Sequence, residues 1–116
     1  MKFKTVRRVM AMFFPQYRAR LIEQVGGEVA RECRAGVWQC VRQQVCCMSV
    51  PEARGYVRAQ AAWFAAVRVG PSLDRYSLKP SLRSQVLASG VEQLVAMIVR
   101  DSLSEAAVGD ARTLAA

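Results

Sequence analysis

The chain has 116 residues and a formal net charge of +8, from 17 lysines and arginines against nine aspartates and glutamates. Hydrophobic residues make up 53% of it, which excludes a disordered polar tail. It contains no histidine, so His-assisted nucleophiles, His-ligated metals and an imidazole base are excluded as well. The length predicts a single domain spanning residues 1–116.

The first 14 residues form a predicted short amphipathic helix that ends at Pro15. Its aromatic and aliphatic residues recur every three or four positions. The cations between them are Lys2, Lys4, Arg7 and Arg8. This basic segment could bind an anionic membrane surface or a partner. Alternatively, its aromatic residues could close the core of a helical bundle. Core closure is the commoner arrangement inside a compact domain.

The apolar part of this N-terminal segment is too short for a secretory signal, and no small-x-small cleavage site follows it. No stretch of the sequence approaches the ~20 apolar residues of a membrane span. We therefore expect a cytoplasmic protein.

Helical periodicity continues over residues 16–48, where the pair Gly26 and Gly27 is a candidate break. A new helix is predicted to begin at Ser49, because Ser49 and Glu52 match a capping box and Pro51 lies in the first turn. Its predicted end is Val69, before Gly70 and Pro71.

Residues 70–81 are loop-like in composition, and the last long helix is predicted over 82–103. Beyond it, the chain either starts a short helix near Ser102 or continues the same one, and residues 110–116 are expected to fray. No alternating strand pattern occurs. The fold class is therefore predicted to be all-α: a small helical bundle of three long helices plus the short N-terminal amphipathic helix.

The predicted core follows the apolar faces of these helices. Its members are Ile22, Val29, Cys33, Val37, Cys40, Tyr56, Trp63, Phe64, Val67, Leu87, Val91, Leu94 and Ile98.

Three of the four cysteines, Cys33, Cys40 and Cys47, repeat every seven residues. Their Cα atoms would be about 10 Å apart on one helix, too far for a disulfide. Without C-x-x-C pairs, a zinc site is not expected. The favoured interpretation is a buried stripe of small apolar residues, and the alternative is a stripe that meets its twin in a symmetric dimer. A thiol sensor would depend on Cys46 and Cys47.

A narrow arc opposite the cysteines combines arginines with a tryptophan. It contains Arg31, Arg34, Trp38 and Arg42, and Arg54 and Arg58 extend a basic surface onto the next helix together with Arg68, Ala61 and Ala65. Guanidinium groups would bind phosphates while the indole stacks on a base. For Trp38 itself, packing against the bundle is the favoured alternative.

Catalysis is not expected, because the carboxylates are scattered and no phosphate-binding glycine loop is present. Glu28 and Glu32 lie one helical turn apart, but no E-x-x-H element accompanies them, so they are expected to pair with arginines. No metal or cofactor is predicted. A helix-turn-helix is rejected, because the only candidate second helix lacks polar residues to read bases.

The leading prediction is a non-catalytic binding or regulatory module whose basic helical surface contacts an anionic partner: nucleic acid first, or an acidic protein surface. The alternative is a homodimeric interaction adaptor that uses the cysteine stripe or a stripe of small residues, with charge serving only solubility. That second stripe is Gly55, Ala59, Ala62 and Ala66. A thiol-based sensor is the third hypothesis.

Overall fold

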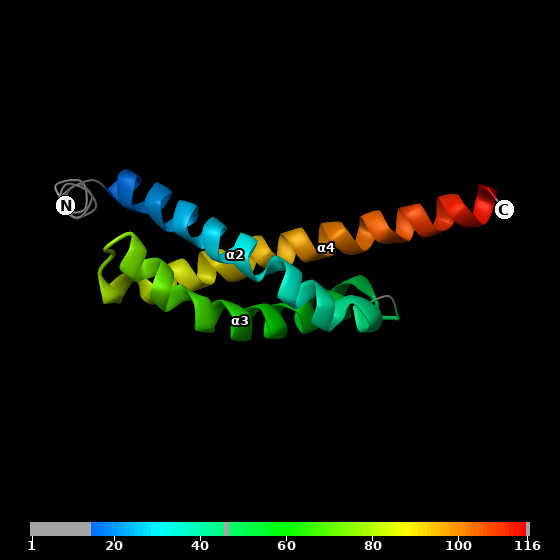
Figure 1. Ribbon diagram of the computed structural model, residues 1–116, viewed down its shortest axis with the longest axis horizontal. Helices are drawn as coiled ribbons and strands as arrows, with labels where there is room; N and C mark the ends of the chain where they lie inside the picture. Colours follow the sequence, from blue (N-terminus) through cyan, green and yellow to red (C-terminus); the bar gives the residue numbers. More distant parts are fainter. Residues whose placement is uncertain (1–14, 46, 116) are drawn as a thin grey trace.

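The computed structural model describes residues 15–45 and 47–115, with side chains up to Glu105. It contains α2 (Pro15–Val45), α3 (Val50–Arg75), a short 3-10 helix η1 (Pro80–Leu82) and α4 (Arg83–Ala115). The three long helices pack against one another as a bundle, and α4 extends past the connection between α2 and α3 (Figure 1). The all-α prediction is confirmed. The helix expected over residues 1–14 lies outside the described residues.

Helix α2 passes through Gly26 and Gly27 without interruption, so the predicted break is wrong. A Cβ atom on Gly26 would lie only 2.7 Å from Ser89 Oγ and 2.9 Å from the backbone nitrogen of Gly90. A Cβ atom on Gly90 would lie 3.3 Å from the Gly26 carbonyl oxygen. The glycines therefore allow the backbones of α2 and α4 to approach closely where the two helices cross, and this packing offsets their low helix propensity.

Helix α3 begins where the capping box predicts. Ser49 has an extended backbone (φ −66°, ψ 161°), and its hydroxyl oxygen accepts a hydrogen bond from the Glu52 backbone N–H at 3.4 Å. Pro51 occupies the first turn, where its missing N–H costs nothing.

The predicted end of this helix at Val69 is wrong, because α3 continues through Pro71 to Arg75. An interior proline removes one hydrogen bond and costs about 3 kcal/mol. The turn beyond it buries Ser72 and Leu73, and burying one leucine side chain returns about 1.5–3 kcal/mol. The Arg83 guanidinium also donates to the Ala66 carbonyl oxygen at 3.3 Å, just before the proline turn. Tertiary contacts thus extend the helix past its local stop signal.

The connection from α3 to α4 is shorter than the loop predicted over 70–81. The Leu78 backbone N–H donates to the Leu73 carbonyl at 3.0 Å, and Ser77 adopts a positive φ of 54° to make the turn. After η1, α4 runs unbroken to Ala115, so the continuation alternative is correct and no separate short helix forms. Fraying of residues 110–116 stays a prediction.

Buried side chains form two clusters. The central cluster combines α2, α3 and α4, and the end cluster lies where α2 begins, α3 ends and α4 begins. Leu87 packs against both clusters. The predicted core residues of α2 and α4 that are buried are Ile22, Val29, Cys33, Val37, Val91, Leu94 and Ile98.

The predicted core face of α3 is correct only in part. Trp63 and Val67 are exposed to 65% and 61%, whereas Ala61 and Ala65, assigned to the basic surface, are completely buried. Phe64 and Tyr56 lie half-buried at the edge of the central cluster. Methyl side chains let α3 approach both other helices closely, so its core face is the one with the smaller residues.

Candidate anion-binding surface

Two arginines of the basic arc of α2 are exposed and pair with carboxylates of α4. Arg34 forms a two-point pair with Asp101 of α4, in which Arg34 Nε lies 2.9 Å from Oδ2 and Nη2 contacts Oδ1. Hydrogen bonding to Asp101, together with the charge of that carboxylate, raises the pKa of Arg34 above its ordinary value. Arg42 Nη2 lies 3.4 Å from Glu105 Oε1. Two of the three predicted anion-binding arginines of α2 therefore already have carboxylate partners.

Trp38 lies between these arginines on α2, half-buried against the central cluster. The packing alternative is therefore confirmed. The guanidinium groups on either side of this indole, those of Arg34 and Arg42, already pair with carboxylates.

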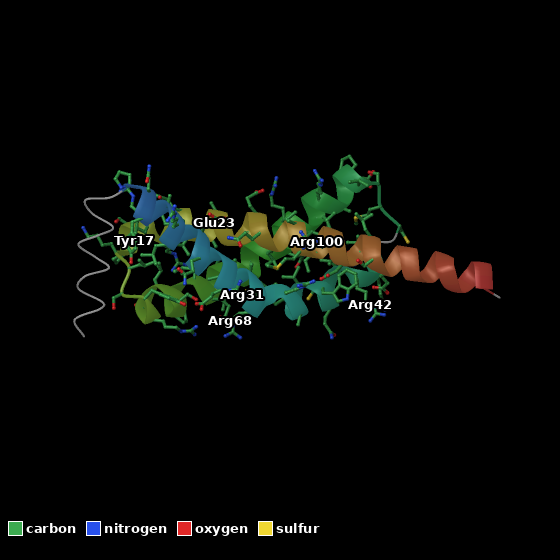
Figure 2. The ribbon with its side chains drawn as sticks, turned by 90° about the horizontal axis from the view of Figure 1, so that it is seen from above. Tyr17, Glu23, Arg31, Arg42, Arg68 and Arg100 are labelled. Carbon is green, nitrogen blue, oxygen red and sulfur yellow. The ribbon has the colours of Figure 1, made fainter. Side chains whose placement is uncertain are left out.

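Arg31 is exposed on the same helix and forms no ion pair with a carboxylate whose position the structure gives. Figure 2 shows Arg31 and Arg42 along α2 and Arg100 on α4. Of the predicted residues on α2, Arg31 alone therefore keeps its positive charge uncompensated.

The predicted arginines of α3 line a groove against α4. This arginine groove has a volume of about 380 Å³ and is lined by Arg54, Arg58, Glu92, Val95, Ala96, Val99, Arg100 and Leu103. Arg58 Nη2 lies 2.9 Å from Glu92 Oε1. Among residues 15–45 and 47–105, no carboxylate pairs with Arg54 or Arg100. Three guanidinium groups thus meet one carboxylate.

Sequence reasoning missed Arg100, because it lies away from the main apolar face of α4. Glu92, Ala96 and Arg100 are spaced four residues apart, and so are Arg54 and Arg58. Each spacing places its residues along one side of a helix. The sequence contains both rows, but only the packing of α3 against α4 brings them together.

An apolar pocket adjoins the arginine groove at the end of the bundle where α2 connects to α3. It measures about 180 Å³ and is lined by Val45, Met48, Val50, Ala53, Val57, Ile98, Val99, Ser102 and Leu103. Val99 and Leu103 line both the pocket and the groove. Val50 and Leu103 remain 58% and 63% exposed.

The two glutamates of α2 pair with α3. Arg75 Nη1 lies 3.3 Å from Glu32 Oε1 and 3.7 Å from Glu28 Oε2. Within the part of the chain that the structure describes, no three His, Cys, Asp or Glu side chains gather in a way that could hold a metal ion.

The heptad stripe of cysteines is not a core stripe. Cys33 is buried and its pKa is raised above the ordinary value of 9.0, because burial outweighs the opposing charge of Arg68. Cys40 and Cys47 are exposed. The buried row of α2 advances in steps of four, through Cys33, Val37, Val41 and Val45, so the row of sevens turns away from the core. Cys46 lies outside the described residues.

The N-terminal cations Lys2, Lys4, Arg7 and Arg8 also lie outside the described residues, so the membrane or partner role of that segment stays a prediction. No helix in the described ranges combines the length and apolar character needed to span a membrane.

Comparisons of the chain with protein-family models, with curated proteins and with solved structures give no match. The class is therefore defined by fold and site: a basic three-helix bundle with an arginine-lined groove between α3 and α4.

Proposed function

We propose that this protein is a non-catalytic binding module whose basic helical surface contacts an anionic partner. The observation that carries the proposal is the arginine groove, where Arg54 and Arg100 lie without a carboxylate partner among the described side chains and Arg58 lies beside them. Nucleic acid is the first candidate on grounds of charge. A protein with a net charge of +8 is attracted to a phosphate backbone, and its binding releases the counterions condensed there.

Arg54 and Arg100 are better binding residues than the arginines of α2. An anion at Arg34 or Arg42 would first have to displace Asp101 or Glu105. The uncompensated guanidinium groups of the groove can donate to phosphate oxygens with no such exchange. Arg31 is the one predicted residue of α2 that remains suitable.

The test is binding of labelled mixed-sequence DNA and RNA, measured by fluorescence anisotropy at about 50 and 200 mM salt. We expect affinity to fall steeply with salt and to weaken further in Arg54→Glu and Arg100→Glu. The matched control is Arg18→Glu, which makes the same charge change at an exposed arginine in the first turns of α2. Arg34→Glu is unsuitable because it would set a carboxylate against Asp101.

Salt-insensitive binding, or equal losses in all three charge-reversal variants, would contradict a role of the groove. No binding of either nucleic acid would remove nucleic acid as the partner and leave an acidic protein surface as the remaining candidate.

The exposed face of α3 favours a second candidate, the homodimeric interaction adaptor. Trp63 and Val67 are spaced one turn apart and are largely exposed, and the Trp63 ring meets Phe64 edge-on with centroids 5.0 Å apart. Gly55, Ala59 and Ala62 of the predicted small-residue stripe are exposed beside them, while Ala66 is half-buried. Large exposed apolar side chains on a helix are typical of interaction surfaces.

Sedimentation equilibrium over a range of protein concentrations tests self-association. We expect a dimer that Trp63→Lys disrupts, with Arg18→Lys as the control. A concentration-independent monomer mass for the unmodified chain would exclude this function. The thiol-sensor hypothesis gains no support from the burial of Cys33 and stays a prediction.

A further inference from the structure

The arginine groove and the apolar pocket form one continuous depression. They share Val99 and Leu103, which follow one another by a single turn on α4. From Glu92 to Leu103 the α4 wall is about 16 Å long, at 1.5 Å per residue. The depression is therefore basic along one part and apolar at the end.

The apolar end has the size of one large side chain. Its volume is about 180 Å³, and its walls come from the end of α2, the start of α3 and α4. Val50 and Leu103 expose more than half of their surface there. A pocket of this kind receives a single apolar anchor residue of a partner.

A phosphate backbone has no apolar group to fill such a pocket. A nucleobase needs an aromatic or guanidinium plane to stack on, and the residues lining the pocket include no aromatic side chain. The apolar half thus favours a protein partner over nucleic acid.

The charges of the groove determine which kind of protein is complementary. Arg54 and Arg100 lie uncompensated by described carboxylates, beside the Arg58–Glu92 pair. A second copy of this chain carries the same surplus of +8 and is electrostatically disfavoured as the occupant. A segment rich in glutamate or aspartate has the complementary charge.

From these features we infer that the depression between α3 and α4 docks an acidic amphipathic helix of a partner protein. One apolar anchor of that helix fills the pocket at Leu103, and its carboxylates pair with Arg54 and Arg100. Two packed helices present a long groove in which a further helix lies with its apolar residues inward. This inference rests on the proposed function, because it uses the same arginines and names their partner.

The test uses the full chain and a labelled synthetic peptide of about 16 residues, with leucines every three or four positions and glutamates beside them. Its control is a scrambled peptide of the same composition. Binding is measured by fluorescence anisotropy, in parallel with a single-stranded oligonucleotide. We expect the amphipathic peptide to bind more tightly than the scrambled one.

Paired variants locate the binding. Arg54→Glu, Arg100→Glu and Leu103→Ser are each expected to weaken peptide binding about tenfold or more. Arg18→Glu is the control for charge, and Val67→Ser is the control for loss of an equally exposed apolar residue that lines neither the groove nor the pocket. Val50→Ser changes a residue that lines the pocket but not the groove, so we expect it to weaken peptide binding and to leave oligonucleotide binding unchanged. Circular dichroism confirms that each variant is folded.

Equal binding of both peptides, or no difference between test and control variants, would overturn the inference. Oligonucleotide binding through Arg54 and Arg100 without peptide binding would overturn it and leave the proposed function standing. Binding of neither ligand would overturn both.

Discussion

Cys33 and Cys40 lie seven positions apart on α2 and have opposite environments. Cys33 is 3% exposed within the central cluster, and Cys40 is exposed beside Trp63 and Phe64. A thiol reacts as its thiolate, so both burial and a raised pKa suppress the reactivity of Cys33.

Alkylation of the native protein with iodoacetamide should therefore distinguish these two residues. We expect Cys40 to be modified more than about tenfold faster than Cys33, because Cys33 reacts only after local opening. Peptide mass spectrometry of timed samples provides the measurement. Denaturant should equalise the two rates, and equal rates in the native state would contradict the burial of Cys33.

The raised pKa of Cys33 predicts a pH dependence of stability. The unfolded thiol ionises near 9.0 and the folded one only at higher pH, so the native state binds more protons in that interval. The contribution of Cys33 is complete below pH 9.0 and is lost as pH rises through the folded pKa. Urea unfolding at a series of pH values measures this. Above pH 9.0 the free energy of unfolding should fall more steeply for the unmodified chain than for Cys33→Ala. Parallel curves would refute this.

At the scale of the elements, glycines have different roles according to what lies beside them. Gly26 faces the backbone of Gly90 at the crossing of α2 and α4, whereas a Cβ atom on Gly55 would meet nothing within 4 Å. Both residues are helical, so their intrinsic helix propensity is the same and only their surroundings differ.

Alanine substitution of these two glycines should have effects of opposite sign. We expect Gly26→Ala to lower the free energy of unfolding by about 1–3 kcal/mol, because a Cβ atom forces the helices apart. Gly55→Ala should raise it by about 0.5–1 kcal/mol through lower unfolded-state entropy. Chemical denaturation measures both changes. Destabilisation of similar size in the two variants would show that the crossing is not close.

The same contrast explains Pro71. Taken alone, Gly70 and Pro71 end a helix, yet the burial of Leu73 in the end cluster keeps α3 helical for one more turn. Gly70 and Pro71 are a genuine helix stop signal, but the packing of Leu73 against residues distant in sequence outweighs it.

At the scale of the whole molecule, the two core clusters lie one after the other along the bundle. Each of the three long helices contributes to both, and Leu87 packs against both. The continuous helices and the shared contact of Leu87 therefore couple the two clusters.

Thermal unfolding should accordingly be a single cooperative transition. Trp38 and Trp63 belong to the half of the bundle around the central cluster, whereas far-UV circular dichroism reports on all the helices. We expect the two signals to change at one common midpoint. Separate midpoints would show that the end cluster unfolds on its own.

The candidate site was predictable in part. Arg54 and Arg58 were identified from their spacing and lie in the arginine groove. Arg34 and Arg42 were identified on the same grounds, but α4 supplies carboxylates to both. Arg100 was missed because its neighbours in the groove come from another helix. Charge spacing along one helix does not reveal the charges that a second helix brings to it.

The sequence by itself determined the helical class, the start of α3 at Ser49 and part of the buried rows of α2 and α4, because capping and helical periodicity act within a few residues. The tertiary structure alone decided the core face of α3, the continuity of α2 at Gly26, the end of α3 beyond Pro71 and which arginines remain uncompensated. Those features depend on which helix faces lie against each other, and the small side chains of Ala61 and Ala65 fit that interface where Trp63 does not.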